Sequence, residues 1–393
     1  MLRALRERWI LDPRVTFLNH GSFGACPREV LDEAARLRER IEREPVRFFV
    51  GELEGLLDEA RASAAAFVGA SPEDLAFVPN ATHGVNTVLR SLDLSPGDEL
   101  LTTDHAYGAC KNALDFVAGR CGARVVVAEV PFPTAGPEVV IEAVLGAVTP
   151  RTRLALIDQV TSPTALVLPV EHIVRALAER GIDTLVDAAH APGMVPMALD
   201  RVGAAYTTGN FHKWVCAPKG AAFLHVRRDR QAAVRPLAVS HGASSPRRDR
   251  SRFLLELDWT GTADPAAFLA VPAALRFLES LLPGGIARVM AVSHAAAVTA
   301  RRALCDALGI EPPCPDEMIG SMASVPIAPS FEPPVGAFDP LQEVLFSRFG
   351  IEVPIIPWPA APARLLRVST PPYVEPADVE ALIAALRALG VME

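Results

Sequence analysis

Short apolar runs that alternate with helical stretches limit most strongly what this chain can fold into. The runs are "LAFV" (75–78), "ELLTT" (99–103), "RVVVAEV" (124–130), "RLALID" (153–158) and "TLVD" (184–187). The helical stretches between them include "CKNALDFVAG", "PEVVIEAVLGAV" and "PVEHIVRALAERG". Strands that are apolar throughout and alternate with helices are typical of a parallel sheet covered on both faces. The sequence therefore predicts an α/β fold.

Further helices and loops divide the chain. Apolar residues at helical spacing predict a helix that begins at Pro27 and a second that ends near Val68, where Gly69 suits a helix end. Proline-rich stretches at 312–315 and 354–362 indicate loops, and "PADVEALIAALRAL" predicts a C-terminal helix. We expect a large α/β domain over residues 1–270 and a smaller α/β domain over residues 271–393.

Composition excludes several classes of protein. No apolar run reaches the roughly 18 residues that a membrane span needs, and the arginine-rich N-terminus lacks the apolar core of a secretory signal. A soluble, cytoplasmic protein is expected. The net charge of -8 argues against nucleic acid as a partner, and the basic cluster "SPRRDRSR" is typical of a solvated loop. Six cysteines without CxxC pairs indicate reduced thiols, with no disulfide and no metal site.

Ligands of open parallel sheets bind beyond the carboxyl ends of the strands, so the residues that end each run are the candidates for a site. The first run is followed by "NATHGVNTVLRSL". The backbone amides of Ala81, Thr82 and His83, together with the Thr82 hydroxyl, would hold a phosphate at the start of a helix. An ordinary helix cap by Asn80 or Thr82 explains the same residues.

Two further strand ends carry polar or aromatic groups. His105 and Tyr107 follow the second run, and either ring would stack on a flat ligand, move a proton or simply fill space. Thr161 and Ser162 follow "RLALID", where they would face a ligand or bind the backbone of a turn.

Asp187 ends the run "TLVD" among apolar neighbours, and His190 follows three residues later. A buried carboxylate is costly unless a positive group pairs with it. The alternative is that Asp187 caps the next segment.

Lys213 lies in "GNFHKWVCAPKG", between two stretches that look buried. Burial lowers the pKa of a lysine and makes its amine a nucleophile that forms a Schiff base with an aldehyde. Pyridoxal 5′-phosphate (PLP) needs an anion cradle, a stacking ring, a carboxylate for its ring nitrogen and a lysine. The residues at these strand ends, taken together, predict a PLP site centred on Lys213.

An ordered series of motifs resembles the class V aminotransferase family of fold-type I PLP enzymes, and within it the isopenicillin N epimerase-like group and its C–S lyase relatives. The motifs are "FLNHGSFGACP", "EPVRFF", "VPNATHGVNTVLRSL", "DHAYGA", "DQVTSPTALVLPV", "VDAAHAPG", "NFHKWVCAPKG", "GTADP" and "IEVPI". The resemblance spans most of the chain. It implies a mostly parallel central sheet flanked by helices, with a smaller C-terminal α/β domain.

The resemblance also implies roles for residues around the cofactor. Lys213 forms the Schiff base, Asp187 pairs with the ring nitrogen, and His190 lies near the 3′ oxygen. Ser162 also reaches that oxygen, although relatives often have asparagine there, and His105 stacks on the ring.

The phosphate contacts come from two subunits in such enzymes. The resemblance assigns them to Ala81, Thr82, Asn210 and His212 of one chain. Thr262, in "GTADP", matches a threonine that reaches the phosphate of a partner subunit. A homodimer with shared active sites is therefore expected.

For an amino-acid substrate, the resemblance implies that Asn19, His20 and Gly21 line its binding site. Arg367 in "LLRVST" matches the arginine that grips the substrate carboxylate with two hydrogen bonds. Arg47 would bind a second acidic group or cap the preceding helix.

The reaction stays open between several outcomes. Such an enzyme labilises the Cα–H bond of an amino acid, and epimerisation, elimination of sulfur from Cβ or transamination follows. Tyr107 or His105 is the candidate for the second acid or base. The segment "RFGIEVPIIPWPAAPARLLR" has no cysteine where desulfurases carry their sulfur acceptor. A non-catalytic protein of the same fold is less consistent with Asp187, Lys213 and Arg367 together, and no GxGxxG loop supports a nucleotide-binding domain.

Overall fold

A seven-stranded sheet forms the centre of the molecule in this computed structural model, which describes residues 5–332, 336 and 338–392. The strand order is β2-β8-β7-β6-β5-β3-β4. The strands are β2 (Leu75–Val78), β3 (Glu99–Thr103), β4 (Arg124–Ala128), β5 (Thr152–Asp158), β6 (Asp183–Asp187), β7 (Tyr206–Asn210) and β8 (Ala222–Val226). All five predicted strands are present, with ends within two residues of the predicted runs.

Strand direction within this sheet is parallel except at β8, which runs antiparallel to both of its neighbours, β2 and β7. The remaining neighbours pair in parallel, and β5 and β6 lie in register over five residues of each strand. The prediction of a mostly parallel sheet is confirmed. Since β8 returns antiparallel from β7, the loop between them, which contains Lys213, lies at the carboxyl edge of the sheet.

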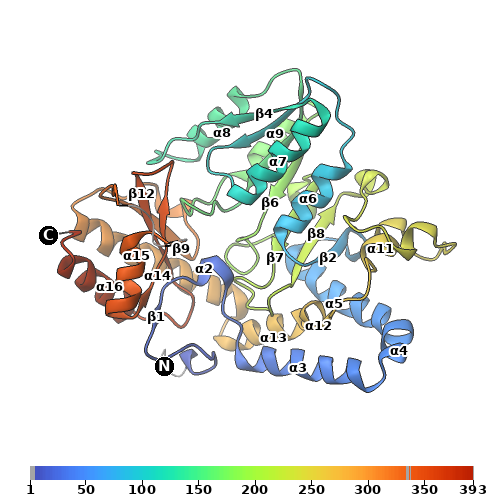
Figure 1. The fold of residues 1–393 in the computed structure, drawn as a ribbon, viewed down its shortest axis with the longest axis horizontal. Coiled ribbons are helices and arrows are strands. Elements are labelled where there is room, and N and C mark those ends of the chain that lie inside the picture. The colour runs from blue at the N-terminus through green and yellow to red at the C-terminus, as the bar shows by residue number, and fades with distance from the viewer. Residues whose placement is uncertain (1–4, 333–335, 337, 393) are drawn as a thin grey trace.

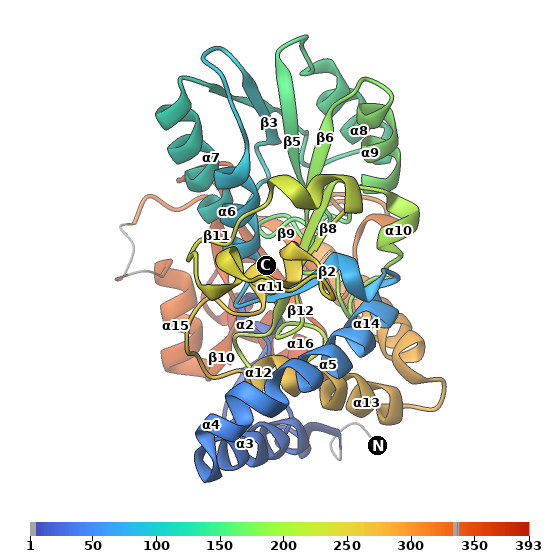
Figure 2. The same ribbon diagram turned by 90° about the vertical axis from the view of Figure 1, so that its right-hand side faces the viewer.

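Helices cover the sheet on both sides, as Figure 2 shows. Helices α6 (Ala81–Ser91) and α7 (Gly108–Cys121) lie on one side, and α8 (Pro137–Gly146) and α9 (Val170–Ala178) on the other. Nearly all of the central strand residues are buried, which explains why their sequences are apolar without alternation.

The two N-terminal helices also form where the sequence predicts them. Helix α3 (Arg28–Arg43) follows Pro27, whose fixed φ of -72° suits the residue just before a helix. Helix α5 (Leu53–Val68) ends at Gly69, which adopts the left-handed conformation with a φ of 66°.

The C-terminal part contains a three-stranded antiparallel sheet in the order β11-β12-β9, to one side of the large sheet (Figure 1). Its elements are α14 (Gly285–Leu308), β9 (Met322–Ile327), α15 (Pro340–Phe349), β11 (Ile355–Pro357), β12 (Arg364–Ser369) and α16 (Pro376–Ala388). The prediction of a loop over 354–362 is wrong for residues Ile355–Pro357, which form strand β11. This strand tolerates Pro357 because it lies at the edge of its sheet, where a missing amide costs no hydrogen bond.

The N-terminal segment contacts this C-terminal part. Strand β1 (Thr16–Phe17) pairs in parallel with β10 (Ile351–Glu352), and the short helix α2 (His20–Phe23) follows it. In Figure 1, α2 lies between the two sheets. The domain boundary at residue 270 stays a prediction.

No single helix among the described residues is long and apolar enough to cross a membrane. One bent pair, Ala266–Leu281 with Gly285–Leu308, reaches the required length and composition only jointly, across a bend of 69°.

Candidate active site

A cavity of about 380 Å³ lies where several parallel strands of the large sheet end. Nine of the residues predicted for the site line it: Ala81, Thr82, Tyr107, Ser162, Asp187, His190, Asn210, His212 and Lys213. They come from segments up to 132 positions apart in the sequence, which the strand order brings to one edge of the sheet. The residues chosen by the carboxyl-edge rule therefore lie together at one edge of the sheet.

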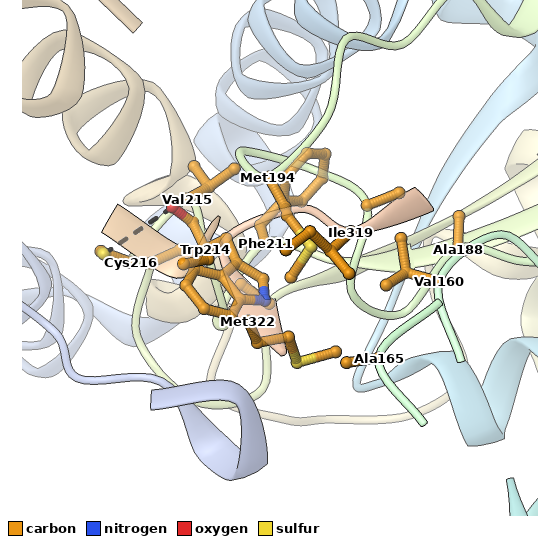
Figure 3. Packing of buried hydrophobic residues seen from close by; sticks show 14 of the residues in the cluster. Val160, Ala165, Ala188, Met194, Phe211, Trp214, Val215, Cys216, Ile319 and Met322 are labelled. Atoms are coloured by element: carbon orange, nitrogen blue, oxygen red, sulfur yellow. Dashed lines mark hydrogen bonds between the residues drawn. The ribbon is translucent and has the colours of Figure 1, made fainter. Parts of the chain in front are cut away.

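The loop that contains Lys213 is held by buried packing beneath it. Figure 3 shows Trp214, Val215 and Cys216 of this loop among buried apolar side chains that include Met194 and Met322. Cys216 has a positive φ of 61°, which is uncommon for any residue except glycine, and its thiol faces the Trp214 carbonyl oxygen at 3.8 Å. The packing fixes a backbone turn from which Lys213 enters the cavity.

The amine of Lys213 lies 3.0 Å from His190 Nε2. The indole nitrogen of Trp214 donates to the other ring nitrogen, Nδ1, at 3.5 Å, so the proton of a neutral His190 is on Nε2 and faces the amine. An unprotonated Lys213 amine accepts a hydrogen bond from that N–H group. Burial, followed by the charge of Arg367, lowers the pKa of Lys213 to about 7, which agrees with this arrangement.

The carboxylate of Asp187 is held at the end of β6. Its Oδ2 accepts a hydrogen bond from the Cys110 thiol at 3.1 Å, and its Oδ1 accepts one from the Ala189 amide at 2.9 Å. Burial raises the pKa of Asp187, and the two donors and the charge of Lys213 partly offset that rise. Among the described residues no arginine or lysine forms an ion pair with Asp187, so the carboxylate has room for a cationic partner from a ligand.

The start of α6 lines the cavity with Asn80, Ala81 and Thr82. The Asn80 side chain accepts a hydrogen bond from the His83 amide, and the Asn210 side chain accepts one from the Ala81 amide at 2.9 Å. No protein acceptor within the described part of the chain binds the Thr82 amide, which remains available to a ligand beside its hydroxyl. Gly84 lets the helix approach β7 closely, because a Cβ there would lie 2.1 Å from the Thr208 hydroxyl.

His212 and Lys219 also line the cavity. The Nδ1 nitrogen of His212 donates to the Ala221 carbonyl at 2.9 Å, which leaves Nε2 as the nitrogen for a ligand. Burial lowers the pKa of His212 to about 4. An anion at Nε2 would favour the protonated ring and so reverse this shift.

Arg367 enters from β12 of the small sheet and is 3% exposed. Its guanidinium donates to the Ser162 carbonyl at 2.6 Å, to the Ser162 hydroxyl at 3.2 Å and to the Ser22 hydroxyl at 3.1 Å. Burial lowers the pKa of Arg367 to about 10, which leaves the group charged at neutral pH. Both serines line the cavity, and no carboxylate of the described residues pairs with Arg367. A buried guanidinium without a carboxylate partner is suited to an acidic substrate group.

The two rings predicted after β3 differ in their surroundings. His105 is fully buried and does not line the cavity. Its Nδ1 lies 2.7 Å from the Thr164 hydroxyl, and its Nε2 lies 2.8 Å from the Val130 carbonyl. A carbonyl only accepts, so Nε2 carries the proton and both nitrogens are occupied. Tyr107, which precedes α7, lines the cavity and is 47% exposed.

The segment predicted to line the substrate side lies mostly beneath the cavity. The side chain of Asn19 donates to Glu352, and the Gly21 amide donates to Ser369. His20 is fully buried, with its nitrogens 2.7 Å from the Tyr373 hydroxyl and 3.1 Å from the Lys213 carbonyl oxygen. His20 thereby supports the backbone of the Lys213 loop, whereas Ser22 and Phe23 of the same segment line the cavity.

Three other predicted residues lie outside this cavity. Arg47, on the short helix α4 (Pro45–Arg47), is exposed and lies 3.8 Å from Glu44 and 3.9 Å from Glu52. Thr262 is exposed on the surface, and His83 faces a separate pocket beside Trp259.

Further residues that line the cavity were not predicted from the sequence, among them Ser22, Phe23, Asp158 and Lys219. Asp158 was visible as a carboxylate that ends an apolar run in the same way as Asp187. The other three had no signal, because only the folding of α2 and of the loop after Lys213 brings them to the cavity.

These residues fit PLP. The available Thr82 amide and hydroxyl suit its phosphate, and the buried Asp187 suits a protonated ring nitrogen. The Lys213 amine, whose pKa burial lowers to about 7, suits its aldehyde.

Comparison with known proteins supports the same assignment. The sequence profile described as aminotransferase class-V matches residues 25–335. Isopenicillin N epimerase of Amycolatopsis lactamdurans is 37% identical over 399 residues, which is 98% of each chain. Isopenicillin N epimerase of Streptomyces clavuligerus is 34% identical, over 98% of this chain and 97% of its own. A probable chloroplastic L-cysteine desulfhydrase of Arabidopsis thaliana is 30% identical, over 96% of this chain and 83% of its own.

Solved structures share the fold. A C-DES mutant with glycine covalently linked to its PLP cofactor superposes with a TM-score of 0.80 at 19% identity, over 97% of this chain and 98% of the other. The cysteine desulfurase CsdA of Escherichia coli superposes with a TM-score of 0.78 at 21% identity, over 100% and 99% of the two chains. The fold, the geometry around Lys213 and the sequence similarity agree: this chain belongs to the class-V aminotransferase family and is a PLP-dependent enzyme.

Proposed function

We propose that this enzyme removes the Cα proton of an amino acid and then either returns a proton to the opposite face of Cα or releases a sulfur group from Cβ. The observation that carries the proposal is one cavity lined by Lys213, Asp187 and Tyr107, with Arg367 behind two serines of its wall. Similarity to isopenicillin N epimerase over 98% of the chain favours epimerisation, and similarity to L-cysteine desulfhydrases supports elimination as the second candidate.

PLP bound in this cavity supplies an electron sink that stabilises negative charge at Cα. Lys213 holds the cofactor through its amine and afterwards acts as the base that takes the Cα proton. Its lowered pKa of about 7 leaves a substantial fraction of the amine unprotonated at neutral pH, as a base requires. His190, 3.0 Å away, orients that amine.

Arg367 positions the substrate by its carboxylate. Ser162 and Ser22 hold the guanidinium in place from two sides, so its orientation is set before a substrate binds. A fixed guanidinium gives the carboxylate one preferred orientation and so directs the Cα–H bond toward Lys213.

Tyr107 is the residue that we assign as the second acid. Both nitrogens of the alternative, His105, are occupied by Thr164 and Val130, and that ring does not line the cavity. Tyr107 does line it, and its phenol has a hydroxyl that can donate. In epimerisation Tyr107 protonates Cα, and in elimination it protonates the departing sulfur.

Incubation in heavy water with a panel of amino acids and cysteine conjugates tests the proposed reaction. Epimerisation gives deuterium at Cα with loss of optical purity, and elimination gives pyruvate, ammonia and a released thiol. We expect Tyr107→Phe to lower either activity by roughly 10²–10⁴-fold, because it removes one acid. Conversion of bound PLP to pyridoxamine phosphate with release of a keto acid, reversed by a second keto acid, would instead establish an aminotransferase.

We infer that two copies of the chain share their active sites. The resemblance assigns Thr262 to the phosphate of a partner subunit, and Thr262 is exposed and away from its own cavity. Large apolar side chains on the same molecule are also exposed: Phe23 at the cavity is 75% exposed, Val46 77% and Val50 85%. Exposed apolar groups of this size support an interface with another chain.

Mixing of two defective chains tests this arrangement. Thr262→Ala should weaken PLP binding by about 1.5–3 kcal/mol, the usual contribution of a hydrogen bond to a charged group. When that chain exchanges subunits with a Lys213→Ala chain, one intact site forms in each mixed dimer, and we expect partial activity to return. A monomer with normal PLP content would contradict the shared site.

A further inference from the structure

Two carboxyl groups, rather than one, line the candidate cofactor cavity at the ends of neighbouring strands. Asp158 ends β5 and Asp187 ends β6, and the two residues are direct partners in the parallel pairing of these strands. Side chains that are in register on neighbouring parallel strands lie on the same side of the sheet. Asp158 is 4% exposed, Asp187 is 3% exposed, and both line the same cavity.

The surroundings of the two carboxyl groups differ. Asp187 accepts hydrogen bonds from the Cys110 thiol and the Ala189 amide, which stabilise its charged form. Asp158 faces the Tyr107 amide and its own amide, which favour its charged form, but burial first and then the charge of Asp187 raise its pKa well above the usual value. The other charge that acts on Asp158 is Lys213. Burial, followed by the charge of Asp187, raises the pKa of Cys110, which stays a protonated thiol.

The geometry points to Asp158 as a positioning residue that shares one proton with Asp187, so that the pair carries a single negative charge. Two carboxylates side by side in a buried site do not both ionise, because their repulsion adds to the cost of burial. Asp187 is the member that ionises, since both of its oxygens accept hydrogen bonds, Oδ2 from the Cys110 thiol and Oδ1 from the Ala189 amide. Asp158 keeps the proton.

The functional consequence of this shared proton rests on the proposed cofactor site. A pair with one negative charge balances one protonated ring nitrogen, whereas two ionised carboxylates would leave an unpaired buried charge beside it. A protonated Asp158 thereby leaves Asp187 as the one negative charge beside the ring nitrogen. This charge matches the single positive charge of a protonated pyridine ring.

The test uses protein without cofactor, so its outcome does not depend on which reaction the enzyme catalyses. A carboxyl whose pKa is raised in the folded state keeps its proton at a pH where the unfolded chain has released it. The folded state therefore loses stability as the pH rises above 3.8, the ordinary pKa of the carboxyl in the unfolded chain. We expect the melting temperature of the wild type to fall relative to Asp158→Asn, by about 2 °C or more between about pH 5 and pH 9.

Asp115→Asn, on the exposed face of α7, is the matched control, because it removes one carboxylate that is exposed and does not line the cavity. Its melting curve should follow the wild type at each pH. Infrared spectra at neutral pH provide a second measurement: the band of a protonated carboxyl should be present in the wild type and Asp115→Asn and absent in Asp158→Asn. Parallel melting curves for the wild type and Asp158→Asn, or an unchanged infrared band, would overturn the inference.

Discussion

Lys213→Ala is expected to lower turnover by at least roughly 10²–10⁴-fold, the range that a positioned acid–base group contributes. The loss should be at the upper end or beyond it, because the same amine both holds the cofactor and takes the Cα proton. The fold should survive, since Lys213 reaches into a cavity while Trp214 and Val215 provide the packing of its loop.

Lys111→Ala is the matched control for this variant. Lys111 lies on α7 and does not line the cavity, so turnover and visible absorbance should remain near the wild-type values. Steady-state kinetics and PLP content measured on all three proteins decide the matter. Retained turnover in Lys213→Ala would exclude the amine from the reaction.

Asp187→Ala is expected to have the second-largest effect. Removal of one partner of a buried charge pair costs about 3–5 kcal/mol, so PLP affinity should fall by roughly 10²–10³-fold or more. Turnover should fall as well in the PLP-saturated variant, because the ring nitrogen loses the group that keeps it protonated. Titration of cofactor-free protein with PLP, followed by kinetics at saturating PLP, separates the two effects.

Asp183→Asn, at the opposite end of the same strand, is the control for Asp187→Ala. Its carboxylate pairs with Arg230 at the protein surface and does not line the cavity. This change should leave PLP affinity unaltered and affect stability by at most about 1 kcal/mol, as is usual for a partly exposed ion pair. Equal PLP affinity of Asp187→Ala and the wild type would contradict the role of Asp187.

Strand positions in the large sheet were predictable because burial on both faces leaves a continuous apolar run. The direction of β8 was not predictable, since the apolar run "AFLHV" indicates a buried strand but not whether it pairs parallel or antiparallel. Strand β11 was missed because Ile355 and Ile356 lie in a proline-rich stretch, and only an edge position makes Pro357 compatible with a strand.

The residues at the centre of the site could be predicted because they lie at strand ends, whereas the residues at its rim could not. Asp187 and Lys213 end or follow buried strands, and the rule that ligands bind at that edge placed them correctly in one cavity. Phe23 and Lys219 reach the cavity only through loop conformations. His20 was expected beside the substrate and instead lies beneath Lys213, because its nitrogens bond Tyr373 and the Lys213 carbonyl across more than 190 positions of sequence.

Reduction with borohydride followed by peptide mass spectrometry tests the central claim most directly. The chain contains only three lysines, Lys111, Lys213 and Lys219, so few amines compete for the cofactor. Lys219 lines the same cavity, which makes the comparison between the two neighbouring lysines a stringent one. We predict one pyridoxyl adduct, on the peptide that contains Lys213. An adduct on Lys219 or Lys111, or no adduct in protein that had been saturated with PLP, would contradict the account.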